Sequence, residues 1–413
     1  MLNPKTNERE LAYLAKVDKI EPIPDKDFVE CAVVNGWKTM VRKEVFKPGD
    51  IGIYFEIDSK VPENNECFAF LEPKHYKIKT QKFKQFYSQG LLMHPHDLGW
   101  TVADDFVVDN KGIAHDVNDE TRFLTKMLDV TYAVAEDNKR KANSEDKYKK
   151  MAKRNPKFFS KRIPRWLMRR NWGKKLLFFF FGKKQDKKGG WLDWVTKTDE
   201  ERCQNLPFIF TNPDWTDVEW YATEKLDGTS STFTLKKERS KTLFYVCSRN
   251  VCFDTPEKAD RCYYDTNVYL EMSQKYNVKE VLQKLLDSDN NLDFVTIQGE
   301  TYGAGIQKRD YSISDHDFMA FNLIYGYKDG KTKRENPRVM TDTLVPLGVP
   351  CVPIVDEHFK LPASCDELLA IAEGKSKVDG LPREGLVFRD TKGERSFKAV
   401  SNSFLVKYHG KDE

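Results

Sequence analysis

The stretch Glu224-Lys225-Leu226-Asp227-Gly228 places a lysine two residues before an Asp-Gly pair. A Lys-x-Asp-Gly tetrapeptide is a weak signal by itself, because a turn on a protein surface readily has this composition. The related sequence Lys328-Asp329-Gly330 lies further along the chain, where it reads as a plain hairpin turn. The interpretation of Lys225 therefore depends on the motifs that accompany it.

Several short motifs follow Lys225 in order. Each has an ordinary structural explanation, since Glu300 could cap a turn and Glu384 could precede a strand. They are Ser248-Arg249-Asn250, Gln298-Gly299-Glu300, Asp317-Phe318-Met319-Ala320-Phe321-Asn322, Glu384-Gly385-Leu386-Val387-Phe388-Arg389 and Ser396-Phe397-Lys398. Together they resemble the covalent nucleotidyltransferase superfamily of DNA ligases, RNA ligases and capping enzymes. The resemblance covers about half of the chain, from Thr198 to Tyr408.

Further motifs resemble those ATP-dependent RNA ligases that carry an OB-like domain before the nucleotidyltransferase domain. We expect no C-terminal OB domain of the DNA ligase and capping enzyme type, because the sequence ends at Glu413, just past the last motif. This expectation favours an RNA ligase. The additional motifs are Val195–Arg202, Gly303–Gln307, Asn35-Gly36-Trp37, Phe46–Asp50, Tyr54–Asp58 and Ser88–Leu91.

Short strands and turns dominate the first 130 residues. Asn35-Gly36, between Ala32–Val34 and Trp37–Arg42, is a strong hairpin signal, and Ile51–Ile57 is typical of a buried strand. The C-terminal half mixes strand-like runs with a helical pattern at Val268–Leu286. We predict an α+β protein with three parts: an OB-like, RNA-binding β-barrel domain (1–130), a basic helical or linker insertion (131–195), and an antiparallel-sheet-based, ATP-grasp-like nucleotidyltransferase domain (196–413).

Charge is distributed unevenly. The net charge is +4, but residues 138–188 contain 20 Lys and Arg against three acids, a local charge of +17 that leaves −13 on the remainder. A basic block on an otherwise acidic protein is typical of contact with a polyanion, and a solvated linker is the alternative. Its apolar islands, Ile163–Trp172 and Leu176–Phe181, are expected to pack on a neighbouring domain rather than on an anionic membrane. We expect the block to supply RNA affinity rather than chemistry.

The segment Lys79–Leu92 mixes lysines with aromatic residues. This composition suits a surface that binds a phosphate backbone and stacks bases. It suits an ordinary strand with exposed lysines equally well.

The sequence shows no evident zinc motif, signal peptide or membrane-spanning segment. The eight cysteines form no Cys-x-x-Cys pair and there are seven histidines, so no zinc site is evident. Met1–Glu10 does not resemble a signal peptide, and the longest apolar run has six residues, against the roughly 20 that span a bilayer. We expect a soluble cytoplasmic monomer with no membrane partner; the nucleus or an organelle stays open as its location.

The family resemblance implies a role for Lys225. Its amine would attack the α-phosphorus of ATP, expel pyrophosphate and form lysyl-AMP. AMP would then pass to the 5′-phosphate of an RNA end, and a 3′-OH would attack to release AMP. A free lysine has a pKa of about 10.4 and is protonated at neutral pH. We expect burial and two nearby cations, Lys398 and Arg249, to lower this pKa; the cations would also bind the phosphates.

The resemblance also implies a divalent cation, Mg²⁺ or Mn²⁺. Asp227, Glu300 and Glu384 would hold it through its water molecules, because Mg²⁺ keeps much of its hydration shell and commonly binds together with substrate phosphates. Glu300 is a candidate for contact with the ribose as well, and Arg249 for contact with the ribose or phosphate of AMP.

Adenine requires a flat apolar partner. We select Phe321 rather than Phe318, because residues three apart in a strand face opposite sides. Glu224 is the candidate for contact with the adenine edge.

The last motif departs from the family pattern. Many relatives have two lysines two residues apart, whereas here Val400 follows Lys398 at that spacing. Lys407 is a candidate for the second cation of the nucleotide site, and a solvated terminal lysine is its ordinary explanation.

Two other functions stay open. One is a DNA ligase or a GTP-dependent capping guanylyltransferase, and the other is a non-catalytic RNA-binding relative. The complete set of reactive residues argues against the second, because a binding module does not require all of them. They are Lys225, Asp227, Glu300, Glu384 and Lys398.

Overall fold

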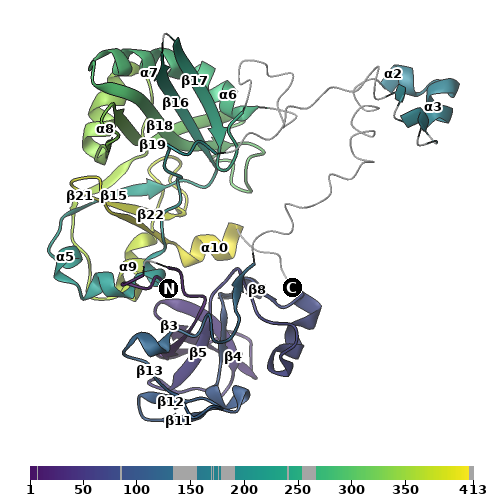
Figure 1. Cartoon of the computed structure of the whole chain (residues 1–413), viewed down its shortest axis with the longest axis vertical. Coiled ribbons are helices and arrows are strands. Elements are labelled where there is room, and N and C mark those ends of the chain that lie inside the picture. The colour runs from purple at the N-terminus through teal and green to yellow at the C-terminus, as the bar shows by residue number, and fades with distance from the viewer. Residues whose placement is uncertain are drawn as a thin grey trace.

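The computed structural model describes residues 1–6, 8–83, 86–133, 156–168, 170, 172–174, 176–177, 191–239, 241–253 and 267–408. In Figure 1 the strand-rich N-terminal domain lies at the lower end and the larger sheet of the C-terminal domain at the upper end. A smaller sheet and helix α10 (Asn402–Tyr408) lie between them. This arrangement confirms the predicted α+β class, with a β-rich domain first and a mixed domain second.

The hairpin predicted at Asn35-Gly36 is present. It joins β3 (Val29–Val34) to β4 (Trp37–Arg42), and its two turn residues have φ values of 50° and 78°. Positive φ at both positions gives the turn the twist that paired strands need. β5 (Ile51–Phe55) is buried along its whole length, which confirms the buried strand predicted there.

Two antiparallel three-stranded sheets form the body of the N-terminal domain, in the orders β1-β5-β10 and β2-β3-β4. Trp37 and Tyr54 stack in its core with ring centroids 6.4 Å apart, and both are fully buried. The other strands of this domain are β1 (Ala12–Lys16), β2 (Lys19–Pro22), β6 (Ser59–Lys60), β7 (Lys77–Ile78), β8 (Gln81–Phe83), β9 (Phe86–Ser88), β10 (Leu91–Met93), β11 (Thr101–Ala103), β12 (Phe106–Val108), β13 (Ala114–Asp116) and β14 (Thr131–Tyr132).

Part of the predicted insertion is helical. Helices α2 (Pro156–Phe159) and α3 (Arg162–Met168) lie in it, and the buried side chains of Phe159 and Leu177 belong to a small apolar cluster. Much of the basic block 138–188 lies outside the described residues. Among the helices that are described, none combines the length and the apolar character needed to cross a membrane.

The larger sheet of the C-terminal domain has the antiparallel order β17-β16-β18-β19-β20. Three helices contribute to the apolar core on one of its faces, and Figure 1 shows them around this sheet. The strands are β16 (Thr229–Glu238), β17 (Lys241–Ser248), β18 (Leu292–Gly303), β19 (His316–Tyr327) and β20 (Thr332–Arg334), and the helices are α6 (Val268–Lys275), α7 (Val278–Asp287) and α8 (Pro337–Leu344).

The helical pattern at Val268–Leu286 corresponds to two helices, α6 and α7, rather than one. Asn277 separates them with a φ of 46°, in the left-handed region that asparagine tolerates better than most residues. Lys328-Asp329-Gly330 lies in the hairpin between β19 and β20, where the Gly330 amide donates to the Tyr327 carbonyl at 2.9 Å. The plain turn predicted for this look-alike motif is confirmed.

The smaller sheet of the C-terminal domain has the order β21-β15-β22-β23. Lys225, the last residue of β15, pairs with Gly385, the first residue of β22, and this register brings Lys225 beside Glu384. The elements of this region are α5 (Pro213–Thr216), β15 (Trp220–Lys225), β21 (Ile354–Phe359), α9 (Cys365–Ala372), β22 (Gly385–Asp390) and β23 (Ser396–Val400).

The two domains touch through backbone and side-chain contacts. The Leu2 amide donates to the Asn205 carbonyl at 2.8 Å, and the Lys19 ammonium lies 2.7 Å from the Asp366 carboxylate. The hairpin turn at Gly36 faces Cys365: a Cβ added at this glycine would lie 2.7 Å from the Cys365 Sγ.

Replacing Gly36 by alanine should therefore destabilise the protein in two ways. The residue has a φ of +78°, and the new methyl group would overlap Cys365 at the domain contact. Gly112 is a matched control, because its φ is +77° and a Cβ there meets nothing within 4 Å. We expect Gly112→Ala to cost about 1 kcal/mol, from backbone strain alone, and Gly36→Ala to cost about 1–3 kcal/mol more. Chemical denaturation measures the loss of unfolding free energy in each variant. Equal losses in Gly36→Ala and Gly112→Ala would contradict the predicted overlap with Cys365.

Candidate active site

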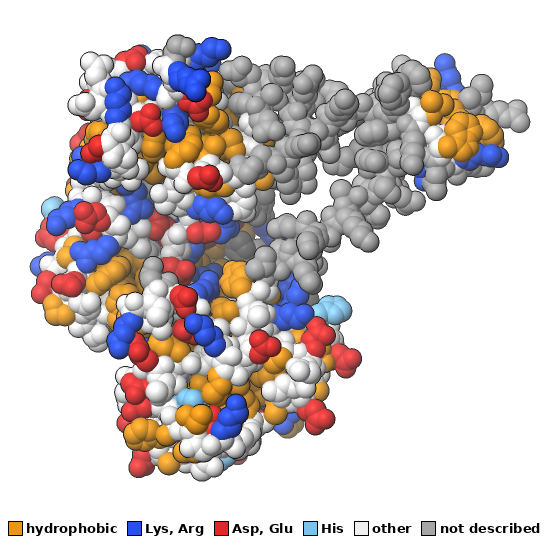
Figure 2. Space-filling view, viewed as in Figure 1, with side chains coloured by type: hydrophobic (Ala, Val, Ile, Leu, Met, Phe, Trp, Pro, Cys, Tyr) orange, Lys and Arg blue, Asp and Glu red, His pale blue; other side chains and the backbone are white. Residues whose placement is uncertain are grey.

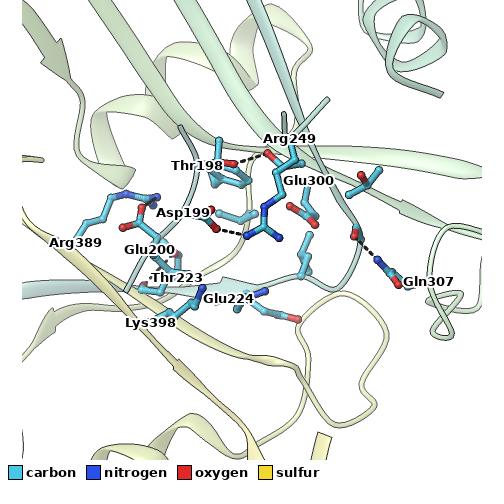
Figure 3. Close-up of a pocket in the computed structure, with 18 residues that line it drawn as sticks. Thr198, Asp199, Glu200, Thr223, Glu224, Arg249, Glu300, Gln307, Arg389 and Lys398 are labelled. Carbon is cyan, nitrogen blue, oxygen red and sulfur yellow. Dashed lines mark hydrogen bonds and ion pairs between the residues drawn. The ribbon is translucent and has the colours of Figure 1, made fainter. Parts of the chain in front are cut away.

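A cavity lies between the two sheets of the C-terminal domain, and Figure 3 shows the side chains around it. Strands β15, β22 and β23 contribute from the smaller sheet, and β16, β18 and β19 from the larger one. The lining residues are Thr198, Asp199, Glu200, Thr223, Glu224, Lys225, Leu226, Gly228, Thr229, Ser230, Arg249, Glu300, Gln307, Phe321, Val352, Val387, Arg389 and Lys398.

Lys225 ends β15 with its side chain 24% exposed. Its Nζ donates a hydrogen bond to Oε1 of Glu384 at 2.6 Å. Burial favours the neutral amine and lowers the pKa, but the carboxylates of Glu384 and Glu300 outweigh burial and raise the pKa of Lys225 above its ordinary value. The expectation that this pKa is lowered is therefore wrong for the protein by itself, because the carboxylates dominate over the cations.

The turn after Lys225 packs tightly against β18. A Cβ at Gly228 would lie 2.3 Å from the Thr301 carbonyl oxygen, so only glycine fits there. This packing holds Asp227 in the turn, where it is 5% exposed and its amide donates to the Tyr311 hydroxyl at 2.6 Å.

The carboxylates predicted to hold a divalent cation lie around Lys225. Burial raises the pKa of Glu300 to about 8. The nearby Lys225 ammonium lowers this pKa, whereas the Glu384 carboxylate raises it. Among the described residues, Oε2 of Glu384 is buried without a hydrogen-bond partner. A divalent cation would favour the charged form of Glu300 and give Oε2 of Glu384 a partner, and such cations prefer oxygen ligands. Asp227, Glu300 and Glu384 therefore suit such an ion.

The two predicted cations occupy different positions. Lys398 lines the inner wall, where burial and the charges of Lys225 and Arg202 lower its pKa to about 8. Arg249 lies at the mouth, 60% exposed, and forms an ion pair with Asp199 that Figure 3 marks.

Phe321 lines the cavity, whereas Phe318 is fully buried in the core beneath the larger sheet. The pairing between β18 and β19 shifts at this point, since Gln298 pairs with Asn322 and Gly299 with Ala320. Phe321 is thus the extra residue of a β-bulge, a feature that redirects side chains. Leu226 and Val352 belong to the same apolar cluster as Phe321.

Glu224 is 2% exposed beside this cluster. Its Oε2 accepts a hydrogen bond from the Lys377 amide at 2.8 Å, and its Oε1 has no partner among the described residues. The cavity thus combines an apolar wall with a free carboxylate acceptor.

Lys407 is not among the residues that line this cavity. It is exposed on α10, with its ammonium 5.0 Å from the ring centroid of Tyr408. The structure therefore does not bring Lys407 to the other predicted site residues, because α10 turns it toward solvent.

Comparisons with known proteins agree with this architecture. The RNA ligase family model matches residues 218–409, and a model of an OB-fold domain matches residues 11–95. The C-terminal domain belongs to the RNA ligase family. The N-terminal match identifies the first domain as an OB-fold domain, as predicted.

Solved structures of RNA ligase from Naegleria gruberi resemble this chain over nearly its whole length. One contains pyrophosphate and another is a variant with ATP and Mn; each is 25% identical to this chain, with TM-scores of 0.61 and 0.62. Both alignments cover 97% of this chain and 99% of the other. No curated protein sequence matches this chain.

The structure adds residues to the site to which the sequence motifs assign no role. Glu200 accepts a hydrogen bond from Arg389 at 3.1 Å, and Arg389 is 2% exposed. Both lie in stretches that signalled the family, so the motifs contained them but could not show that they meet.

Arg202 is a further addition, at the junction with the OB-fold domain. Its guanidinium lies 5.7 Å from the ring centroid of Trp37, and its backbone bridges to that of Lys398. Burial lowers its pKa, and its Nη1 has no hydrogen-bond partner in the described part of the chain. The motif Val195–Arg202 contains this residue but assigns it no role, because that role depends on a contact between domains.

The buried pair of Glu200 and Arg389 yields a prediction. Glu200→Gln should destabilise the protein by about 3 kcal/mol, because it leaves the Arg389 guanidinium buried without a counter-charge. Chemical denaturation of this variant, of Arg389→Met and of the double variant measures the coupling, and the double variant should lose less than the sum of the single losses.

Glu357 is the control, since it pairs with Arg338 on the surface. Glu357→Gln should cost under about 1 kcal/mol. Equal losses at Glu200 and Glu357 would show that burial of the pair has no effect.

Proposed function

We propose that this protein is an ATP-dependent RNA ligase that joins 3′-OH and 5′-phosphate RNA ends through lysyl-AMP and RNA-adenylate intermediates. The observation that carries this proposal is the position of Lys225: it lines a cavity together with Glu300, Lys398, Arg249 and Phe321, and its amine lies 2.6 Å from the carboxylate of Glu384. The match of residues 218–409 to the RNA ligase family model and the likeness to a structure that contains ATP and Mn support it.

The cavity has groups suited to each part of ATP. Phe321, with Leu226 and Val352, offers an apolar surface for adenine, and the free Oε1 of Glu224 can accept a hydrogen bond from its amino group. Lys398 and Arg249 offer positive charge to the phosphates, and Glu300 is placed to reach the ribose.

The chemistry requires Lys225 to lose a proton before its amine attacks the α-phosphorus. Glu384 Oε1, 2.6 Å from Nζ, is placed to accept that proton. The new N–P bond forms as the bond to pyrophosphate breaks, and the electron pair of that bond leaves with pyrophosphate. Mg²⁺ or Mn²⁺, bound by Asp227, Glu300 and Glu384 through water, would neutralise carboxylate and phosphate charge. Once the carboxylates are neutralised in this way, they no longer raise the pKa of Lys225.

We also propose that the RNA lies across both domains. Helix α10 contacts β9 of the OB-fold domain, so this strand of the lysine-rich and aromatic segment lies next to the nucleotidyltransferase domain. The OB-fold domain and the basic block would bind the RNA backbone, and the protein would act as a cytoplasmic monomer.

Self-adenylylation tests the proposed function. Incubation with radiolabelled ATP and Mn²⁺ should give an acid-labile AMP adduct, and labelled GTP should give none. Lys225→Ala should abolish the adduct, because it removes the amine that would attack the α-phosphorus. Lys328→Ala is the matched control: it changes the lysine of the look-alike turn and should leave adduct formation unchanged. An adduct that survives Lys225→Ala, or forms with GTP instead, would refute this assignment.

A pH dependence follows from Lys398. Its pKa of about 8 means that its charge is lost between pH 7 and pH 9 in the protein without ATP. Bound phosphates favour the charged form, so ATP affinity is nearly full at pH 7 and falls by about tenfold at pH 9. Lys398→Arg stays charged throughout and should keep its affinity at pH 9. Equilibrium binding of ATP without metal measures both, and an equal loss in both proteins would show that Lys398 is not responsible.

A further inference from the structure

The loop after β18, residues 304–313, contacts the turn that follows Lys225 at two points. The side-chain Nε2 of Gln307 donates to the carbonyl of Gly228 at 2.9 Å, as Figure 3 shows. The hydroxyl of Tyr311 accepts a hydrogen bond from the amide of Asp227 at 2.6 Å. The loop thus binds both sides of the Asp227-Gly228 turn.

The backbone of this loop is strained beside that contact. Tyr311 and the next residue, Ser312, have φ values of 55° and 58°, in the left-handed region that residues with a Cβ avoid. Such conformations persist only where surrounding contacts enforce them, and they cluster at functional sites. Here the strained conformation brings the Tyr311 hydroxyl to the Asp227 amide.

Arg309 ties the same loop to the segment that carries Glu384. Its Nε and Nη2 donate to the two carboxylate oxygens of Asp379 at 3.2 and 2.5 Å, and its Nη1 donates to the Pro382 carbonyl at 2.6 Å. Both charged side chains are 2% exposed. The guanidinium also lies 4.1 Å from the ring centroid of Tyr311. A bidentate ion pair is the most directional of the side-chain ion pairs, so it limits movement between the two segments.

These contacts join two carboxylates that lie far apart in the sequence. One branch of the network ends on the amide of Asp227 through Tyr311, and the other ends two residues before Glu384 through Arg309. We propose that Tyr311 and Arg309 are positioning residues that fix Asp227 and Glu384 relative to each other, and so set the affinity of the site for its divalent cation. The inference rests on the proposed function for the role of that cation.

Removal of one hydroxyl tests this proposal. Tyr311→Phe keeps the ring and its contact with Arg309 but releases the Asp227 amide. Tyr302→Phe is the matched control: Tyr302 is equally buried, its ring lies 4.9 Å from that of Tyr311, and its hydroxyl faces Asp317 instead. Mn²⁺ binding to the full-length protein is measured by the electron paramagnetic resonance signal of free Mn²⁺. Self-adenylylation is measured against Mn²⁺ concentration, and thermal denaturation establishes that each variant is folded.

We expect Tyr311→Phe to weaken Mn²⁺ binding by about tenfold, the lower end of the range for residues that orient metal ligands. The Mn²⁺ concentration for half-maximal adenylylation should rise in parallel, while the maximal rate at saturating Mn²⁺ stays within about twofold of the parent. Tyr302→Phe should match the parent in both assays. Arg309→Lys, which keeps the charge but loses the bidentate geometry, should shift Mn²⁺ dependence in the same direction.

The outcomes separate this inference from the proposed function. Equal Mn²⁺ affinity in Tyr311→Phe and Tyr302→Phe would overturn the positioning role, even if the parent protein forms the adduct. A loss of maximal rate with unchanged Mn²⁺ dependence would overturn it as well. Weaker Mn²⁺ binding in Tyr311→Phe, with no adduct in the parent protein, would support the positioning role and refute the ligase assignment.

Discussion

The contact between Lys225 and Glu384 organises the C-terminal domain. It closes the end of the pairing between β15 and β22, so strand register alone brings an amine to within 2.6 Å of a carboxylate from 159 residues further along the chain. In this buried setting the carboxylates stabilise the ammonium form of Lys225. The protein by itself therefore holds Lys225 in its charged form, which has no lone pair for attack. Reactivity depends on groups that neutralise the carboxylates, which couples it to occupation of the site.

The charges of Lys225 and Glu384 also affect the pKa values of the other ionisable groups in the site. Lys398 lies on the strand paired with β22, near the Lys225 ammonium, and repulsion adds to burial in lowering its pKa. Glu300 reaches the cavity from the opposite sheet and holds its proton more tightly than usual, because it is buried near Glu384. A cavity in which the pKa values of ionisable groups are shifted in opposite directions is typical of an active site. A ligand that brings both phosphate and a divalent cation would satisfy both sets of groups.

Motif order was sufficient to predict most of the site. Lys225, Glu224, Glu300, Phe321 and Lys398 all line one cavity, and Glu384 accepts a hydrogen bond from Lys225. The choice of Phe321 was made from strand alternation, although a β-bulge at that residue sets its direction. The position of Lys407 and the sign of the Lys225 pKa shift could not be obtained in this way. The first depends on the orientation of α10, and the second on a balance between burial and several charges.

The sequence by itself determined the order of the domains, the hairpin at Asn35-Gly36, the RNA ligase family of the C-terminal domain and most of the residues that the structure brings together at the candidate site. It could do so because these features depend on local turn chemistry and on residue types that the reaction requires. Only the tertiary structure decided which charges meet: Arg389 with Glu200, Arg202 with the OB-fold domain, and the Tyr311 and Arg309 network with the Asp227 turn. The physical reason is that these interactions join segments distant in the chain. Their geometry is set by strand register and domain contact, which no local pattern encodes.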